Sequence, residues 1–174
     1  MTAEQNGGAA AELEEILRGE AGLVSRLYNC ICAEEGALVD DRLEAITRAV
    51  ENQEELAAAL AKTEETRLAK VQELAAALGV AGEKPPLREL TEKLPDAAQA
   101  KRLTAAGQRL ADMMEKLRQK NQTIRGILNL KSDYNEMMLN LIVGVDDTPG
   151  TGYGAHGQIL DAADPGPGMY EIKI

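Results

Sequence analysis

The sequence has almost none of the residues that usually build a catalytic pocket. Its 174 residues include no Trp, no Phe, four Tyr and a single His. The apolar residues are mostly Ala and Leu, mixed with Glu, Gln, Lys and Arg, which is a composition typical of long helices and coiled coils. Because such folds bury a narrow seam and offer little concave volume, we expect a protein that is not an enzyme and that uses no cofactor.

Positive charge is also scarce. The chain has 19 Lys and Arg against 29 Asp and Glu, which gives a net charge of -10. Proteins hold phosphate backbones with clustered Lys and Arg, so this balance argues against a nucleic acid as a partner. No apolar run approaches the roughly 20 residues of a membrane span, and the first residues lack the basic and apolar regions of a signal peptide. These absences predict a cytosolic protein with no direct membrane insertion.

The cysteines are few as well. Cys30 and Cys32 lie two positions apart within a helical pattern. Such positions point about 200° apart on a helix, so these two thiols are poorly placed to bond to each other or to share a metal. We interpret them as small helix residues in a reducing compartment. His156 has no second His and no nearby Cys, and we therefore predict no metal site.

One glycine pattern looks like a nucleotide-binding loop. Gly152, Gly154 and Gly157 form a GxGxxG sequence. Such a loop binds a dinucleotide when the N-terminus of the next helix faces the pyrophosphate. Here the pattern follows a helical stretch and a Thr-Pro-Gly turn, and no helical pattern comes after it. We therefore expect no nucleotide site in this segment.

Hydrophobic periodicity predicts helices over about 9–36, 41–78, 87–94 and 97–145. Gly36 is a plausible stop for the first helix, and Asp40 or Asp41 is a plausible N-cap for the second. A single kinked helix over 9–78 is the alternative. The pair Pro85-Pro86, after two glycines, predicts the main turn of the fold. We expect an all-α protein in which residues 1–145 form a long antiparallel helical hairpin or three-helix coiled-coil bundle.

The last 29 residues differ from the rest. Residues 146–174 contain six Gly and three Pro and lack the helical stripe, which predicts a flexible Gly/Pro-rich tail. The terminal MYEIKI alternates weakly and suits a short strand if a sheet edge is available. Tyr153 is an aromatic residue among glycines, and it is either incidental or a docking anchor, since Tyr buries a large area with little rotamer entropy to lose.

The third long helix carries more apolar residues than a narrow seam requires. Between Met113 and Val145 these residues spread over more than one face, so the first two helices, a second copy or a partner must cover them. Paired methionines favour a partner, because Met side chains repack around different ligands. A two-sided helix at the centre of a homo-oligomer, or a broader intramolecular core, is the alternative. Gly126 and Gly144 lower the local stability of this helix.

A family resemblance rests on four short segments. These are LRQKNQ at 117–122, Asn135, the YGAHGQ sequence at 153–158 and the terminal Ile-Lys-Ile. Together they resemble the FlgN-type flagellar export chaperones. The resemblance implies a cytosolic type III export chaperone that binds the C-terminal helical region of hook-associated (hook-filament junction) proteins and keeps them from premature assembly. It also implies delivery of these clients to the cytoplasmic domain of the export gate, with Tyr153 as the docking contact.

The resemblance and the surplus apolar surface together give a list of candidate client contacts on the third long helix. The predicted contacts are Leu117, Asn121, Ile124, Leu128, Tyr134, Met137, Met138, Leu141 and Ile142. The alternative function is a structural coiled-coil adaptor that buries the same helix in a homodimer or larger homo-oligomer and exchanges no client.

Overall fold

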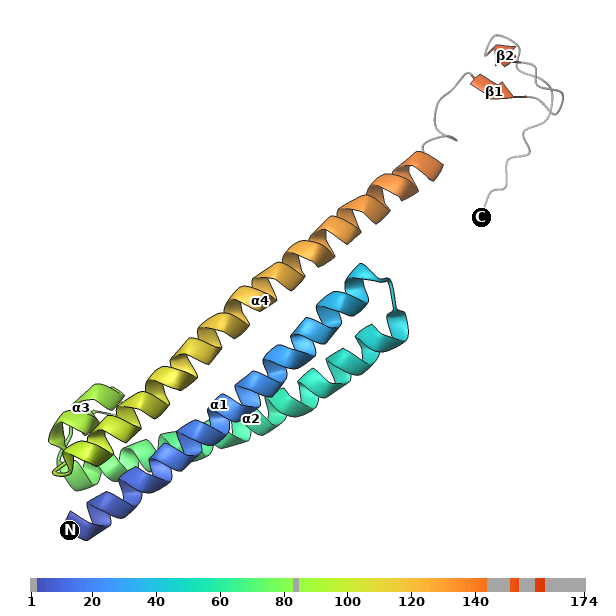
Figure 1. Ribbon diagram of the computed structural model, residues 1–174. Coiled ribbons are helices and arrows are strands. Elements are labelled where there is room, and N and C mark those ends of the chain that lie inside the picture. Colours follow the sequence, from blue (N-terminus) through green and yellow to red (C-terminus); the bar gives the residue numbers. More distant parts are fainter. Residues whose placement is uncertain (1–2, 83–84, 144–150, 154–158, 162–174) are drawn as a thin grey trace, which may run out of the picture. The chain divides into compact units, whose positions relative to one another are not determined.

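The computed structural model describes residues 3–82, 85–143, 151–153 and 159–161. These residues form four helices and two short strands: α1 (Ala3–Val39), α2 (Leu43–Leu78), α3 (Leu87–Lys93), α4 (Ala97–Val143), β1 (Thr151–Tyr153) and β2 (Ile159–Asp161). The chain divides into two compact units, Met1–Ile127 and Leu128–Ile174. The predicted all-α class is confirmed. In unit 1, α1 and α2 form an antiparallel hairpin, with α3 beside the start of α4 (Figure 1).

The first two helices are separate, and the alternative of one kinked helix is wrong. Between them the backbone N–H of Asp40 donates to the carbonyl of Gly36 (3.1 Å) and that of Arg42 to the carbonyl of Ala37 (2.9 Å). Asp41 has a φ of 53°, in the left-handed region that Asp tolerates better than most residues. The helix therefore passes the predicted stop at Gly36 and ends at Val39. The N-cap of α2 is Arg42, without a side-chain cap hydrogen bond, so the predicted N-cap at Asp40 or Asp41 is wrong.

Glycine and aspartate set the end of α2 and the start of α4. Helix α2 ends at Leu78, as predicted, and Gly79 follows with a φ of 63°, which lets its backbone N–H bond to carbonyls of the last turn. Before α4, the Oδ1 atom of Asp96 accepts a hydrogen bond from the N–H of Ala98 at 2.8 Å. This is an N-cap interaction at the start of α4.

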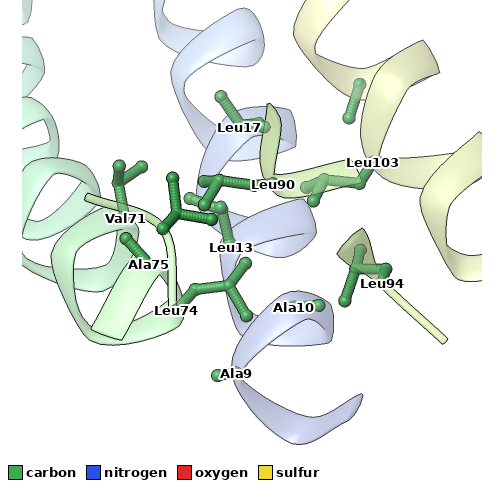
Figure 2. Close-up of a cluster of buried hydrophobic side chains, with 12 residues drawn as sticks. Ala9, Ala10, Leu13, Leu17, Val71, Leu74, Ala75, Leu90, Leu94 and Leu103 are labelled. Carbon is green, nitrogen blue, oxygen red and sulfur yellow. The ribbon is translucent and has the colours of Figure 1, made fainter. Parts of the chain in front are cut away.

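One apolar cluster joins all four helices at the α3 end of unit 1 (Figure 2). Its centre holds Leu13 of α1, Leu74 of α2, Leu90 of α3 and Leu103 of α4, each with no exposed surface. The short helix α3 makes no long seam of its own, but Leu90 closes this end of the hairpin. At about 25 cal/mol per Å² of buried apolar surface, such a cluster is a main source of stability for unit 1.

A second cluster continues the seam toward the α1–α2 turn. It contains Val24, Ile31 and Leu38 of α1 with Leu117 and Ile124 of α4, and Ile46 and Leu60 of α2 pack against it. Helix α1 therefore lies between apolar residues of both other long helices. The core is a narrow seam along the helices, as the composition predicted.

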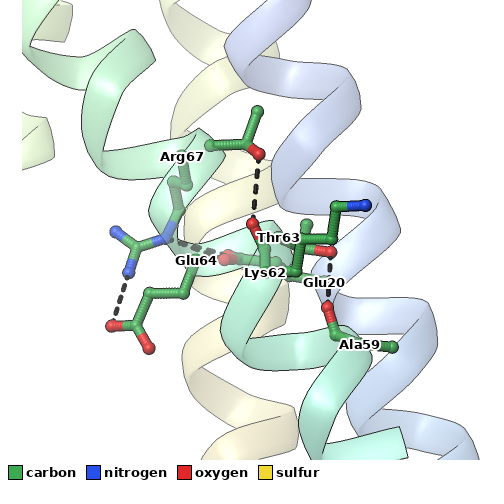
Figure 3. Close-up of polar contacts among 7 residues, drawn as sticks. Glu20, Ala59, Lys62, Thr63, Glu64 and Arg67 are labelled. Atoms are coloured by element: carbon green, nitrogen blue, oxygen red, sulfur yellow. Dashed lines mark hydrogen bonds and ion pairs between the residues drawn. The ribbon is translucent and has the colours of Figure 1, made fainter.

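Charged side chains of α1 contact the neighbouring helices across this seam. Glu20 is only 3% exposed, and the Nε atom of Arg67 on α2 lies 2.9 Å from one of its carboxylate oxygens and 3.1 Å from the other (Figure 3). Arg67 also reaches Glu64 at 3.4 Å. Desolvation raises the pKa of Glu20, and the charge and hydrogen bond of Arg67 oppose that rise. Since an isolated buried charge is costly, this pair favours the observed register of α1 on α2.

The two strands belong to unit 2 and pair antiparallel. Thr151 lies opposite Asp161, Gly152 opposite Leu160, and Tyr153 opposite Ile159. No strand was predicted at these positions. The strand considered for MYEIKI lies outside the described residues, as does Gly144.

Candidate partner-binding surface

A seven-residue repeat runs along the part of α4 that belongs to unit 1. Leu103, Leu117 and Ile124 are at most 7% exposed, and Leu110, seven residues before Leu117, is half-buried against both clusters. A repeat of seven keeps one side of a helix facing its neighbours when helices pack side by side. These residues are therefore the α4 side of the core seam.

A second series lies three residues after the first. Ala106 is buried, while Met113 and Ile127 are half-buried against the second cluster. The remaining member, Lys120, forms an ion pair with Glu35 of α1. The two series together are the spacing of a coiled-coil seam, and in unit 1 the side chains of α1, α2 and α3 cover it.

The same repeat continues in the part of α4 that belongs to unit 2. Counting on by sevens gives Lys131 and Met138 in the first series, and Tyr134 and Leu141 in the second. The apolar members are exposed here: 58% for Tyr134, 37% for Met138 and 59% for Leu141. A seam that is covered in one unit thus has uncovered members in the other.

The apolar surface also widens in unit 2. Leu130 and Met137, each one position before a residue of the first series, are 71% and 53% exposed. At about 100° per residue, five apolar residues fall within an arc of roughly 100° that contains no polar residue. We call this surface the α4 stripe; it consists of Leu130, Tyr134, Met137, Met138 and Leu141.

The chemistry of the α4 stripe suits protein binding. Between Leu128 and Ile142 the only charged residues are Lys131, Asp133 and Glu136, and the other polar residues are Asn and Ser. Apolar anchors spaced by three, four and seven residues are the pattern by which one helix packs against another. Among the described residues, no group of His, Cys, Asp and Glu is arranged to hold a metal ion.

The structure separates the predicted client contacts into two groups. Leu117 and Ile124 are buried in the core of unit 1, because the seam there is covered by α1, so they are not part of an exposed binding surface. Asn121 is exposed on α4 in unit 1. The exposed contacts in unit 2 are Leu128, Tyr134, Met137, Met138, Leu141 and Ile142.

Leu130 and Leu139 were absent from the list of predicted contacts, although they are 71% and 60% exposed. The signal that identifies Leu130 is its position relative to the seven-residue repeat. The corresponding residues of α4 in unit 1 are polar: Arg102, Arg109, Lys116 and Thr123.

A family comparison identifies the chain. The family model described as FlgN protein matches residues 1–160. The chain belongs to the FlgN family. FlgN proteins are flagellar export chaperones, so this FlgN protein has a general role in flagellar protein export and binds flagellar proteins. No curated protein and no solved structure matches the chain.

The FlgN match includes the exposed part of α4, all of β1 and the first two residues of β2, since it extends to residue 160. Tyr153 is the last residue of β1. Gly152 lies in the same strand, whereas Gly154, His156 and Gly157 lie outside the described residues. Within the described part of this FlgN chain, no helix is long and apolar enough to cross a membrane.

Proposed function

We propose that this FlgN protein is a cytosolic chaperone for hook-filament junction proteins and binds their C-terminal helical region through the α4 stripe. The observation that carries the proposal is the exposure of Tyr134, Met138 and Leu141, which continue a buried heptad seam without a covering helix in the described structure. Apolar surface of this extent on one helix marks a site for a protein partner. The amphipathic helix of a client supplies the missing neighbour.

The side chains of the stripe fit an exchangeable client. Two of the five are methionines, Met137 and Met138, whose unbranched side chains adapt to different partner surfaces. Binding covers the apolar face of the client helix as well as the stripe itself. A client held in this way is unable to pair that face with other subunits, which is how the chaperone keeps it from premature assembly.

Delivery requires a second contact that leaves the α4 stripe occupied. We assign this contact to Tyr153, which follows α4 in the chain and lies within the matched family region. A second binding element on the same chain raises the effective concentration of the bound client at the export gate without a large affinity of its own. The net charge of -10 favours solubility for a protein that handles apolar clients.

Replacing Met138 and Leu141 together with Gln tests the role of the stripe. Each substitution removes apolar surface from the interface, so we expect the affinity for the client to fall by about 100-fold or more. The measurement is a calorimetric titration of the full chain with a peptide covering the C-terminal helix of a junction protein from the same organism. The matched control replaces Asn129 and Asn140, which lie on the opposite face of α4, with Gln. Unchanged affinity in a variant with normal helix content would contradict the assignment.

Replacing Tyr153 with Ala tests the second contact. We expect binding to the isolated cytoplasmic domain of the export gate to be lost, because the aromatic anchor is removed, while the affinity for the client peptide stays the same. Both affinities are measured on the same preparation. A variant that retains gate binding would rule out Tyr153 as the docking residue.

The exposed stripe also suits the alternative function, a coiled-coil adaptor that forms a homodimer through α4. Sedimentation of the chain alone distinguishes the two functions. A tight dimer that dissociates when Met138 and Leu141 are replaced supports the adaptor, whereas a monomer that binds the client peptide supports the chaperone.

A further inference from the structure

The exposed part of α4 carries a second apolar surface in addition to the α4 stripe. At about 100° per residue, Leu128, Leu139 and Ile142 fall within roughly 60° of one another, with the exposed polar residue Asn135 between Ile142 and Leu128. They are 43%, 60% and 66% exposed. We call these three residues the second stripe.

On one side of the helix, only Lys131 lies between Met138 of the α4 stripe and Ile142 of the second stripe. On the other side, the arc of about 160° between the two stripes includes a fully polar arc of about 60°. This arc consists of Asn129, Asp133, Glu136 and Asn140. The polar arc is the face of this part of α4 that suits water. The two stripes lie on the rest of the helix circumference.

The two stripes are too wide for one neighbouring helix. Together they span roughly 200° of the helix circumference, whereas a stripe facing a single packed partner spans about 100°. A helix docked on the α4 stripe alone would leave Leu139 and Ile142 in water. The exposure of both stripes shows that the described residues of the chain cover neither of them.

The widening is specific to this part of α4. In unit 1 the positions that precede the first heptad series are held by Arg102, Arg109, Lys116 and Thr123, whose polar side chains border the seam. At the same positions in unit 2 the residues are Leu130 and Met137. Apolar residues there extend the surface beyond a two-helix seam, as in helices at the centre of a bundle.

We infer that the client covers this part of α4 with two helices of one chain, packed side by side, one on each stripe. The inference rests on the proposed function and specifies the form of its partner. Two helices on one chain are favoured over two separate partners, because the second helix then binds intramolecularly. A second copy is disfavoured as the occupant, because each copy has a net charge of -10 and the two would repel.

The test compares two fragments of a junction protein that end at the same C-terminal residue. The short fragment contains the last helix alone, and the long fragment also contains the preceding helical segment. We expect the long fragment to bind the full-length chain about tenfold more tightly or better, since it covers both stripes. Equal affinities for the two fragments would overturn the inference.

Two double variants locate the helices. Replacing Leu139 and Ile142 with Gln is expected to weaken the long fragment about tenfold or more and to leave the short fragment within about twofold. Replacing Leu130 and Met137 with Gln is expected to weaken both fragments. The control is again the pair Asn129→Gln and Asn140→Gln, and circular dichroism verifies that every variant is helical. An unchanged affinity of the long fragment for the Leu139→Gln, Ile142→Gln variant would refute a helix on the second stripe.

These results separate the inference from the proposed function. If both fragments bind equally, the chaperone function stands and the two-helix client is wrong. If neither fragment binds a folded chain, both are wrong. If the chain sediments as a dimer that the Leu139→Gln, Ile142→Gln variant disrupts, the second stripe is occupied by another copy and the inference is overturned.

Discussion

Helix α4 contains two regions with the same heptad repeat and opposite exposure. In residues 97–127 the repeat is occupied by side chains such as Leu103 and Leu117, which are at most 7% exposed. In residues 128–143 the corresponding positions include Tyr134 and Leu141, which are more than half exposed. The difference shows that an apolar repeat identifies the face of a helix that packs against a partner. The repeat does not identify the partner that covers this face. In the first region it comes from the chain, and in the second we propose that it comes from a client.

The largest effect expected from this comparison is on stability. Leu103→Ala should lower the free energy of unfolding by about 2–5 kcal/mol, because it leaves a cavity between four helices. Leu130→Ala, at a site 71% exposed, should change it by about 0.5 kcal/mol or less. Urea unfolding of the two full-length variants measures both. Equal losses would mean that Leu130 is covered in the free protein, which would remove the contrast between the two regions.

Two glycines of α4 provide a second contrast, with a smaller expected effect on the free energy of unfolding. A Cβ atom at Gly107 would lie 2.3 Å from Cδ2 of Leu87, so this side chain must shift to admit Ala. We expect Gly107→Ala to cost about 1–2 kcal/mol after the gain in helix propensity.

Gly126 has open space where its Cβ would be. Gly126→Ala should therefore raise the free energy of unfolding by about 0.5–1 kcal/mol. Thermal unfolding of the two single variants compares their signs. A stabilised Gly107→Ala protein would show that α3 does not pack closely on α4.

The smallest expected effect concerns Glu20, a buried charged residue of unit 1. The described side chains in the exposed region of α4 include no buried charged residue. Burial raises the pKa of Glu20 above 4.5, so the folded state holds this proton to a higher pH than the unfolded state does. The contribution of Glu20 to stability is therefore largest below pH 4.5 and declines as the pH rises toward the folded-state pKa. The stability of the wild type relative to Glu20→Gln should fall over that interval. Urea titrations at several pH values measure the difference, and a constant difference would exclude a raised pKa.

The positions of the helices could be predicted from local sequence. The turn between α1 and α2, and the exposure of individual α4 residues, could not. Gly79 marked the end of α2, since a left-handed residue after a helix is a local requirement. The end of the first helix was misplaced at Gly36, because a single glycine does not by itself end a helix, and α1 continues through it to Val39. Leu117 and Leu141 look alike in sequence, and both were predicted as client contacts. Only Leu117 proved to be buried, since its cover comes from α1, more than 70 residues earlier in the chain.

By itself, the sequence determined the helical class, the heptad spacing of α4 and, through the FlgN match, the family. These follow from local hydrogen bonding and from side-chain spacing along a single helix, so nearby residues suffice to specify them. The tertiary structure alone decided which part of the seam is covered, and that Glu20 pairs with Arg67 in unit 1. Burial depends on neighbours that are distant in sequence, and no single helical pattern states which neighbours will be present.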